Sequence, residues 1–419
     1  MNGSLPGSAR VLAVHRYFWP DTTPYAFLLR AITAQWAAAG HEVHVLTSQP
    51  SYKPELEIPK QPTVGNVDGV TVRRLGMLPD RGSRWRKPSN VVRFSLLVFL
   101  RVLLGRRYDV VMCSTAPPVV LGWATSLAAR LRGASFVYHC MDLHPEIGRL
   151  SGEFANPWVY RLLLRLDTAT CRRAAAVVVL SSDMRDALLD RDAGLADRLV
   201  IINNFDIPSY DANAVSEGAD QPASADGLTV VFTGNIGRFQ GLETVTEAVL
   251  GPDDRLGPVR LVLMGEGDAK PGLERLVAAA PADRRTRVSL LPHGTTEQAR
   301  EVMRGADLGL VSLMPGVIAY AYPSKTASYL SEGLPVLAAV EPASGLAKDI
   351  VAWGVGGVLP VDGVEAVTEA LVGWSVRKPQ LQDMRRRAAQ VWREEFSATA
   401  KLVGWDTLLS DVLSQRGRQ

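Results

Sequence analysis

Residues 9–49 decide the fold, and they read ARVLAVHRYFWPDTTPYAFLLRAITAQWAAAGHEVHVLTSQ. The stretch begins with an apolar run of strand length. It continues over residues 25–40 with apolar residues at helical spacing, which stop at Gly40. A second run of strand length, residues 41–49, follows at once. A strand, a helix and a strand in this order predict two parallel strands joined by a right-handed crossover.

The same alternation covers most of the chain. It continues to residue 206 and is interrupted over 207–226, IPSYDANAVSEGADQPASAD, where Ser, Ala, Asp and Pro dominate without a period. It starts again at residue 227, and its apolar runs are continuous, as in parallel strands whose sheet is covered on both faces. The sequence therefore predicts the α/β class, with two facing Rossmann-like domains, a linker at 207–226 and a ligand-binding cleft between the domains.

The composition favours a soluble, cytoplasmic enzyme. No apolar stretch reaches the roughly 18 residues that a bilayer span needs, and residues 1–10 lack the apolar core of a signal peptide. The net charge of +3 is unevenly distributed, because residues 1–206 carry a balance of +8 and leave −5 for the remainder. Residues 81–107 hold eight Lys and Arg without an acid among them, a run that suits an anionic surface.

Two nucleotide-binding motifs are missing from the sequence. A dinucleotide-dependent dehydrogenase would carry G-x-G-x-x-G after its first strand, but residues 15–25 contain no glycine. The glycines at 234, 237 and 241 have a different spacing, and no Walker lysine motif occurs. Hydride transfer and ATP hydrolysis are therefore disfavoured.

Two stretches of the second half suit an anion. GNIGRFQG at 234–241 is a glycine-rich turn that lets backbone N–H groups approach an anion, with a tight packing turn as the alternative. In AYPSKTASYLSEGLPVLA, residues 321–338, Ser324 is expected to cap a short helix that Gly333 ends. Lys325 would then lie in the first helical turn, where the dipole disfavours a cation unless an anion is bound. Together the two stretches predict a diphosphate site.

Six segments in the right order make the chain resemble the family 4 glycosyltransferases. The resemblance is closest to members that build bacterial surface polysaccharides, including colanic acid and O antigen. The segments are YFWPD at 17–21, GHEVHVLTSQPSY at 40–52, DLHPE at 142–146, GNIGRFQGLET at 234–244, VLMGEGDAKPGLE at 262–274 and YPSKTASYLSEGLPV at 322–336. The resemblance covers nearly the whole chain. It implies the GT-B architecture and transfer of a sugar from a nucleotide-diphosphate donor, a UDP-sugar above all, with retention at the anomeric carbon.

The resemblance also implies which part holds which substrate. Residues 1–206 would bind a glycan, lipid-linked or small-molecule acceptor, residues 227–395 would bind the donor, and the final helix within 396–419 would cross back onto the first domain. No Asp-x-Asp motif occurs in a loop flanked by strands, so we expect no catalytic metal and no other cofactor. No nucleic-acid partner is expected.

Three departures from the family pattern bear on the site. Many members have two glutamates separated by seven residues, and these fall at Tyr320 and Ser328, neither of which is acidic. The usual Arg and Lys of the glycine-rich turn fall at Asn235 and Gln240. The Gly-Gly of the first domain is replaced by residues 22–24, Thr-Thr-Pro, so this loop should contact the donor less through bare backbone.

Four residues are assigned to catalysis. Arg238 and Lys325 are expected to replace the missing cations and to stabilise the charge that develops on the leaving diphosphate, with surface ion pairs as the alternative. Asp142 closes a predicted strand and His144 follows it, so each could orient or deprotonate the acceptor hydroxyl. A helix cap and a packed histidine are the alternatives. Because the leaving phosphate can take the acceptor proton in retaining enzymes, Asp142 is assigned a positioning role first.

The other donor-binding candidates follow predicted strands of the second domain. Glu266 ends one such segment, and residues 291–293 resemble the family's base-contacting segment. Tyr320 and Tyr322 could stack on the donor sugar, with ordinary packing as the alternative. The full donor-binding set is Gly234, Asn235, Gly237, Arg238, Gln240, Glu266, Leu291, Pro292, His293, Tyr320, Tyr322, Ser324, Lys325 and Ser328.

Two questions stay open on the sequence. The basic run encloses VVRFSLLVFLRVLL at 91–104, so residues 81–107 fit either attachment to an anionic membrane at its inner face or burial of an apolar helix within the domain. The missing glutamate pair leaves two rivals to the transferase: a catalytically silent nucleotide-sugar-binding subunit, and a nucleotide-sugar epimerase or hydrolase on the same fold.

Overall fold

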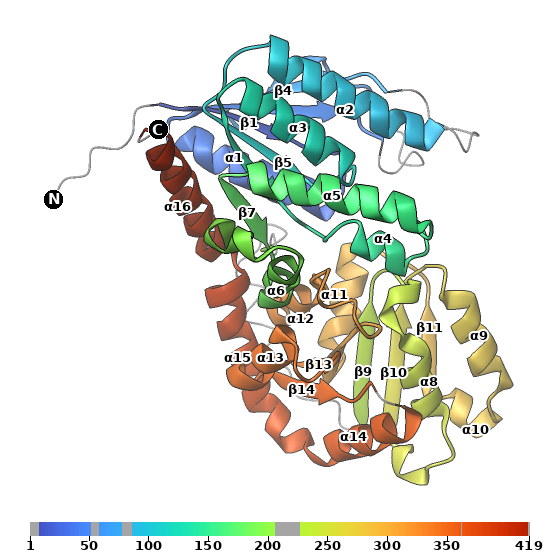
Figure 1. The fold of residues 1–419 in the computed structure, drawn as a ribbon. Helices are drawn as coiled ribbons and strands as arrows, with labels where there is room; N and C mark the ends of the chain where they lie inside the picture. The colour runs from blue at the N-terminus through green and yellow to red at the C-terminus, as the bar shows by residue number, and fades with distance from the viewer. Residues whose placement is uncertain (1–7, 52–57, 78–85, 206–226, 362, 418–419) are drawn as a thin grey trace. The chain divides into compact units, whose positions relative to one another are not determined.

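The computed structural model describes residues 8–51, 58–77, 86–205, 227–361 and 363–417. Contacts within the chain divide it into two units, one of Met1–Ile207 with Ala398–Gln419 and one of Pro208–Ser397. Each unit is built on one sheet of mainly parallel strands with helices packed on it, as Figure 1 shows. The predicted α/β class with two Rossmann-like domains is therefore confirmed. The linker predicted at 207–226 lies outside the described residues.

The N-terminal unit holds an eight-stranded sheet in the order β3-β4-β2-β1-β5-β6-β7-β8. All neighbours run parallel except β3, which pairs antiparallel with β4 at one edge. The connections turn in opposite directions on the two sides of β1 and β5, so the loops that follow these two strands meet at a switch point. The strands are β1 (Arg10–Val14), β2 (Glu42–Ser48), β3 (Val64–Val67), β4 (Val70–Leu75), β5 (Val110–Ser114), β6 (Ser135–His139), β7 (Ala176–Val179) and β8 (Leu199–Ile201).

Helices pack on both faces of this sheet. Helix α3 packs between α2 and α5, whereas α16 packs beside α1, with the Trp36 and Trp405 ring centroids 6.2 Å apart. Helix α16, the last of the chain, therefore belongs to the N-terminal unit. The helices are α1 (Pro24–Ala38), α2 (Arg86–Leu104), α3 (Val120–Leu131), α4 (Glu146–Leu150), α5 (Pro157–Arg173), α6 (Ser182–Arg191), η2 (Ala193–Arg198) and α16 (Ala398–Arg416).

Residues 22–24, which depart from the family's Gly-Gly, begin helix α1. Thr23 caps the helix, since its hydroxyl accepts the N–H of Ala26 at 3.1 Å. Pro24 occupies the first helical position, where no N–H is needed. Asn156 and Pro157 begin α5 in the same way. The substitution of Thr-Thr-Pro for glycine thus has a local structural use.

The hairpin of β3 and β4 is an element that the sequence analysis did not predict. Asp68 and Gly69 form its turn with φ values of 51° and 83°, the left-handed conformation that Asp-Gly favours in a two-residue hairpin loop. Arg30 of α1 donates to the Asp68 carboxylate at 2.5 Å and ties this turn to the helix. The Asp-Gly pair was the signal in the sequence that could have found the hairpin.

The C-terminal unit holds a six-stranded, wholly parallel sheet in the order β11-β10-β9-β12-β13-β14. Counted within the unit, this is the 3-2-1-4-5-6 order of dinucleotide-binding folds. The switch point lies between β9 and β12, beyond Thr233 and Ser312. The strands are β9 (Leu228–Thr233), β10 (Val259–Met264), β11 (Val288–Leu291), β12 (Leu308–Ser312), β13 (Val336–Ala339) and β14 (Gly356–Leu359).

Apolar strand residues form the core of this unit with helices α8, α9 and α14. Helix α11 begins with a capping box, in which Thr295 and Gln298 satisfy each other's backbone N–H groups. The helical segments are η3 (Arg238–Gln240), α8 (Leu242–Leu250), η4 (Asp254–Leu256), α9 (Lys270–Ala279), α10 (Ala282–Arg285), α11 (Thr296–Arg304), α12 (Lys325–Ser331), α13 (Gly345–Trp353), α14 (Val364–Val376), η5 (Lys378–Gln380), α15 (Leu381–Val391) and η6 (Trp392–Phe396).

Candidate functional site

The glycine-rich turn lies at the switch point of the C-terminal sheet, directly after β9. Gly234 and Gly241 have φ values of 114° and 57°, which glycine adopts at least cost. The loop after β12 is bound to this turn, because the amide of Met314 donates to the carbonyl of Phe239 at 2.7 Å. The position is the one where open parallel sheets bind nucleotides.

Close backbone contact explains the glycines of the next loop. A Cβ atom on Gly265 would lie 1.8 Å from the carbonyl oxygen of Gly234, and one on Gly267 would lie 2.3 Å from that of Ile236. The two loops are also hydrogen bonded, since the amide of Ile236 donates to the carbonyl of Glu266 at 2.8 Å. The packing-turn alternative therefore holds for part of the turn.

Three amides of the turn remain available to a ligand. Within the described chain, the backbone N–H groups of Asn235, Gly237 and Arg238 have no hydrogen-bond acceptor. Free N–H groups on a glycine-rich loop are the donors that phosphate-binding loops use. The turn thus combines a packing role with an open set of donors.

Lys325 is a largely buried cation beside this turn. A Cβ atom on Gly234 would lie 3.2 Å from Lys325 Cε, so the lysine stem occupies the space that glycine leaves. The Nζ atom lies 4.5 Å from the centroid of the Phe232 ring. No described residue forms an ion pair with Lys325, and burial lowers its pKa to about 8. A buried ammonium without a counter-charge marks a place that favours an anion.

Ser324 directly precedes helix α12, as predicted, but its side chain does not cap the helix. Ser324 has helical φ and ψ values of −57° and −20°, and its side chain makes no capping hydrogen bond. The turn has already begun at Pro323, whose carbonyl accepts the amide of Thr326 at 3.1 Å, so Ser324 lies inside it. The predicted end of the helix is confirmed, because Gly333 follows α12 with a φ of 63°.

Arg238 is exposed in η3 and, like Lys325, forms no ion pair with a described residue. The surface ion pairs that were the alternative for these two cations are therefore not formed in the described chain. Solvent screens the charge of Arg238 more than that of Lys325. We therefore expect Lys325 to contribute more to the binding of an anion.

The other polar candidates near the turn differ in whether they already have a hydrogen-bond or ion-pair partner. The Gln240 Oε1 atom is buried without a hydrogen-bond donor. Glu266 is exposed and already engaged, because Lys270 donates to it at 2.6 Å and lowers its pKa, with a further contribution from the amide of His293. Leu291 ends β11, and its carbonyl accepts the amide of Gly265 at 3.1 Å. The structure thus brings the predicted segment 291–293 next to the loop that carries Glu266.

Tyr320, Tyr322 and Ser328 are each half-buried. The two tyrosines precede α12, and Ser328 lies in the middle of that helix. Part of each side chain therefore remains accessible. Their predicted roles toward the donor stay predictions.

Glu341 is a site residue that the sequence analysis missed. It follows β13, and its Oε1 atom accepts the amide of Gly316 at 2.5 Å. Its Oε2 atom is buried without a partner. Since Gly316 lies in the loop that binds the glycine-rich turn, Glu341 borders the same region as Lys325. The rule that selected Glu266, a carboxylate at the carboxyl end of a strand, would also have selected Glu341.

In the N-terminal unit, Asp142 and His144 follow β6 as predicted. Burial raises the pKa of Asp142 to about 6. Burial, together with the charge of Arg191, lowers the pKa of His144 to about 4, and the Nδ1 atom of His144 has no hydrogen-bond partner. Arg191 also binds the Glu146 carboxylate at 2.7 Å and 2.8 Å, which gives Glu146 a structural role. Asp142 is therefore partly protonated near neutral pH and His144 is neutral there, whereas Glu146 is held in place.

A buried polar cluster at the N-terminal switch point was not predicted. His15 follows β1 and its Nδ1 atom is hydrogen bonded to the hydroxyl of Ser114, which ends β5. The hydroxyl of Tyr25 is hydrogen bonded to the Nδ1 atom of His139, which ends β6, at 2.9 Å. Burial lowers the pKa of both histidines to about 3, so both rings are neutral at physiological pH. Their positions at strand ends were the signal available in the sequence.

Metal-ligating side chains are dispersed. Among the described residues, no three His, Cys, Asp or Glu side chains are grouped closely enough to hold an ion. Two acidic residues near the glycine-rich turn are instead bound to protein groups, Glu266 to Lys270 and Glu341 to the amide of Gly316.

Comparison with known proteins identifies what the chain is similar to. Residues 26–204 match the model of the glycosyl transferase 4-like domain. Over 320 residues the chain is 23% identical to the putative colanic acid biosynthesis glycosyl transferase WcaI of Escherichia coli, an alignment that covers 71% of this chain and 75% of the relative.

Solved structures share the fold over nearly the whole chain. Sucrose-phosphate synthase of Thermosynechococcus elongatus matches with a TM-score of 0.72 and 16% identity, covering 97% of this chain and 100% of the other. HepE of Anabaena, solved in complex with UDP-glucose, matches with a TM-score of 0.66 and 16% identity, covering 96% and 100%.

Proposed function

We propose that the chain is a family 4 glycosyltransferase, and that it is a retaining, metal-independent enzyme that uses a nucleotide-diphosphate sugar. The donor we propose is a UDP-sugar, and the acceptor is a glycan, a lipid-linked sugar or a small molecule. The crystal structure of HepE in complex with UDP-glucose supports this donor, since HepE shares the fold.

One observation carries the proposal: among the described residues, the largely buried ammonium of Lys325 has no counter-charge, and it lies against a glycine-rich turn in which three amides have no acceptor. Holding such a cation away from water costs free energy unless an anion joins it. A sugar nucleotide brings two linked phosphates, which match one buried cation and a row of N–H donors. In this proposal Lys325 and the turn bind the diphosphate.

The same groups would promote the chemical step. The bond between the anomeric carbon and the β-phosphate oxygen breaks, and negative charge grows on that oxygen. Lys325 and Arg238 stabilise this charge, which is the contribution expected of fixed cations and N–H dipoles. The acceptor oxygen attaches to the same face of the sugar, and its proton passes to the leaving phosphate. This route needs no metal ion and no strong base from the protein.

Asp142 and His144 are proposed to orient the acceptor hydroxyl. The raised pKa of Asp142 leaves a fraction of this carboxyl protonated near neutral pH, so it can donate as well as accept a hydrogen bond. His144 is neutral there and has a free Nδ1 atom. Both are therefore suited to positioning rather than to proton abstraction.

The experiment that tests the proposal measures UDP release from a panel of UDP-sugars, with and without an extract that contains acceptors. Release that depends on the extract supports sugar transfer. Release without an acceptor indicates a hydrolase, and conversion of the donor to an isomer indicates an epimerase. Binding without turnover of any donor indicates the silent subunit, which the replacement of the glutamate pair by Tyr320 and Ser328 favours.

We further propose that the N-terminal unit attaches to an anionic membrane surface through α2. Residues 94, 98 and 102 of this helix are buried, so burial explains one stripe of its apolar residues. A second stripe is exposed and recurs every four positions, at Val92, Leu96, Leu100 and Leu104. Leu104 is 75% exposed. Soluble proteins rarely expose such a row of apolar side chains unless it binds an apolar partner or a membrane.

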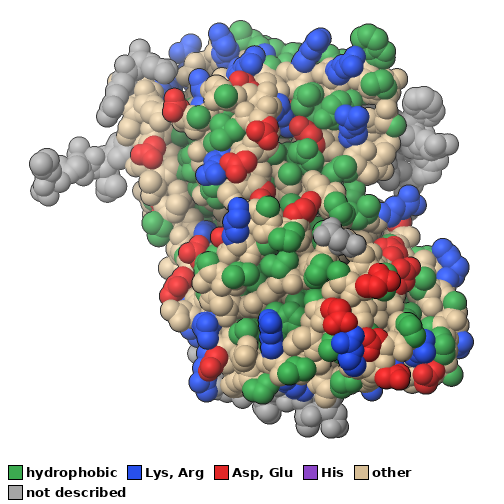
Figure 2. Space-filling view, turned by 60° about the horizontal axis from the view of Figure 1, so that its bottom comes forward, with side chains coloured by type: hydrophobic (Ala, Val, Ile, Leu, Met, Phe, Trp, Pro, Cys, Tyr) green, Lys and Arg blue, Asp and Glu red, His purple; other side chains and the backbone are tan. Residues whose placement is uncertain are grey.

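Charges around this stripe favour anionic lipid. Arg93, Arg101, Arg106 and Arg107 are exposed on α2 or directly after it. Helix α5, on the other side of α3, carries Trp158, which is 76% exposed and lies 5.6 Å from the guanidinium of Arg161. Figure 2 shows Lys and Arg side chains along the upper edge of one face, with hydrophobic side chains between them. Among the described residues, no helix has both the length and the apolar composition to cross a bilayer.

Co-sedimentation with vesicles tests this attachment. The protein should sediment with vesicles that contain phosphatidylglycerol and less with phosphatidylcholine alone, and the binding should weaken as the salt concentration rises. Equal binding at low and high salt would contradict the electrostatic part of the proposal.

A further inference from the structure

The N-terminal unit contains a pocket of about 480 Å³ that is separate from the residues assigned to the acceptor. It lies on the sheet face under the C-terminal end of α2, at the middle of β1, β2 and β4 rather than at their carboxyl ends. The lining residues are Leu12, Glu42, His44, Val45, Leu46, Thr71, Arg73, Arg101, Gly105, Arg106 and Tyr108.

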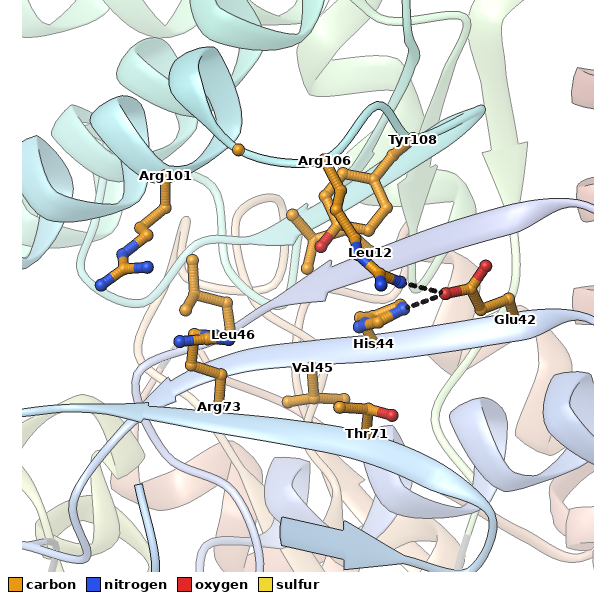
Figure 3. A pocket seen from close by; sticks show the side chains of 11 residues that line it. Leu12, Glu42, His44, Val45, Leu46, Thr71, Arg73, Arg101, Arg106 and Tyr108 are labelled. Atoms are coloured by element: carbon orange, nitrogen blue, oxygen red, sulfur yellow. Dashed lines mark hydrogen bonds and ion pairs between the residues drawn. The ribbon is translucent and has the colours of Figure 1, made fainter. Parts of the chain in front are cut away.

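The charges of the pocket leave a surplus of cations. Glu42, the one acidic residue among those that line it, forms ion pairs with Arg106 at 2.7 Å and Arg10 at 3.2 Å, and it is hydrogen bonded to His44 at 3.0 Å. Arg73 and Arg101 are exposed, and within the described chain neither has an ion-pair partner. Figure 3 shows these two arginines on the side of the pocket away from Glu42. That side therefore presents two guanidinium groups with free donors.

Apolar groups lie beside these donors. Leu12 and Leu46 are each 4% exposed and form part of the wall, with the Tyr108 ring close by. Arg101 and Gly105 of the α2 end line the pocket, and Leu100 and Leu104 precede them by one residue each. Since successive residues of a helix are about 100° apart, the exposed apolar stripe runs alongside the line of α2 that borders the pocket. A ligand here meets cations and an apolar rim together.

We propose that this pocket binds the phosphate group of an anionic phospholipid headgroup, held by Arg73 and Arg101, while Leu100 and Leu104 enter the acyl region of the same leaflet. Arginine is suited to this task because its planar fork donates two hydrogen bonds to a phosphate. A soluble phosphate would satisfy the arginines but would leave the apolar stripe in water, so the lipid is the better match. The inference rests on the membrane attachment proposed above and adds a specific headgroup site to it.

The first test separates a headgroup site from general attraction. The double variant Arg73→Gln/Arg101→Gln removes two charges from the pocket, and Arg93→Gln/Arg107→Gln removes two exposed charges outside it. Binding is measured to vesicles of phosphatidylcholine that contain phosphatidylglycerol. The pocket pair should lose about tenfold more affinity than the matched pair, because it also loses charge-assisted hydrogen bonds. Equal losses would overturn the pocket, while the attachment itself would stand.

The second test changes shape and keeps every charge. Thr71→Phe places a larger side chain, one that strands favour, into the half-buried wall of the pocket. The melting temperature of this variant should be unchanged. Its binding to phosphatidylglycerol vesicles should weaken by about as much as when the two pocket arginines are replaced. Wild-type binding by this variant would contradict the proposal, whichever result the charge variants give.

A titration with soluble phosphate compounds tests whether the pocket binds a lipid headgroup or a soluble ligand. Inorganic phosphate and glycerol 3-phosphate are titrated against the wild-type protein, and both should bind far more weakly than the vesicles. Tight binding of glycerol 3-phosphate without vesicle binding would overturn the lipid in favour of a soluble ligand. Failure of the wild-type protein to bind phosphatidylglycerol vesicles would overturn this inference together with the attachment. Sugar transfer is read separately, as UDP release.

Discussion

The two sheets share a strand order around their switch points but fill those points differently. In the C-terminal unit, Gly234 leaves room for the stem of Lys325, a largely buried cation that has no counter-charge among the described residues. In the N-terminal unit, the same position after the first strand carries His15, which is buried and hydrogen bonded to Ser114. Within the described chain, one switch point therefore has no charge partner for its cation. The other holds neutral side chains that are hydrogen bonded to one another, although the Nε2 atom of His139 is left without a partner.

The difference shows how one topology can serve two purposes. The crossover pattern places two loops at the switch point of either sheet. Whether that place binds an anion depends on which side chains the loops present and on whether the protein already satisfies them. The two histidines are neutral and already hydrogen bonded to Ser114 and Tyr25, so they provide no positive charge for a phosphate. The ammonium of Lys325, which has no ion-pair partner among the described residues, and the free amides beside it can bind a phosphate.

Loss of Lys325 should give the largest effect. Lys325→Ala should lower turnover about 100-fold, because a fixed charge opposite the leaving group is lost. The melting temperature should change little, since Lys325 forms no ion pair that folding depends on. Lys348→Ala, at an exposed lysine of the same unit, is the matched control. An equal loss of stability and turnover would show that Lys325 is structural, and the contrast between the two switch points would fail.

A substitution at the contact between the two loops of the C-terminal switch point should have the next largest effect, on the free energy of unfolding. Gly265→Ala should lower the free energy of unfolding by about 3 kcal/mol, because its Cβ atom would lie 1.8 Å from the Gly234 carbonyl at a φ of 156°. Gly316→Ala is the control. Gly316 has a φ of 84°, but an added Cβ atom would have no neighbour within 4 Å, so backbone strain alone should cost about 1 kcal/mol. Urea denaturation measures both. Similar costs would mean that the loops can separate.

The buried charges of the two units should respond to pH with opposite signs. Between pH 3.8 and about 6 the folded state binds more protons at Asp142 than the unfolded chain does, so the free energy of unfolding falls as pH rises. Between about pH 8 and 10.5 the folded state binds fewer protons at Lys325, so the free energy of unfolding rises with pH.

Asp142→Asn should flatten the acidic window and Lys325→Met the alkaline one, so each variant is the control for the other. Urea denaturation across both windows measures the slopes. A slope that persists in the matching variant would assign it to another group.

The smallest effect is expected in the N-terminal cluster. Tyr25→Phe removes the hydrogen bond to His139 and should lower the free energy of unfolding by about 1 kcal/mol, with turnover nearly unchanged. Tyr160→Phe, at a half-buried tyrosine that packs against Arg149, is the control. A large loss of turnover at constant stability would make this cluster part of the catalytic site and would erase the contrast between the units.

Local patterns predicted much of the fold and part of the site. Alternating runs of strand and helix length identified two α/β units, because a parallel sheet needs crossover helices whatever the details of packing. The glycine-rich turn and Lys325 were also recognisable, since their residue types are unusual at those positions. The position of Ser324 before α12 was right, but its capping hydrogen bond is not formed, because the preceding Pro323 already begins the turn. A local pattern could not reveal that earlier start.

What the sequence by itself determined is the class of fold, a family resemblance and the segments that we predict to bind a sugar nucleotide, because periodicity and residue type are properties of neighbours along the chain. Only the tertiary structure decided which polar groups are satisfied. It paired Tyr25 with His139 across 114 positions and brought the stem of Lys325 against Gly234. It also placed Arg73 and Arg101 beside a pocket, without an ion-pair partner among the described residues. Burial and partnership depend on contacts between distant residues, and these contacts determine where a ligand is needed.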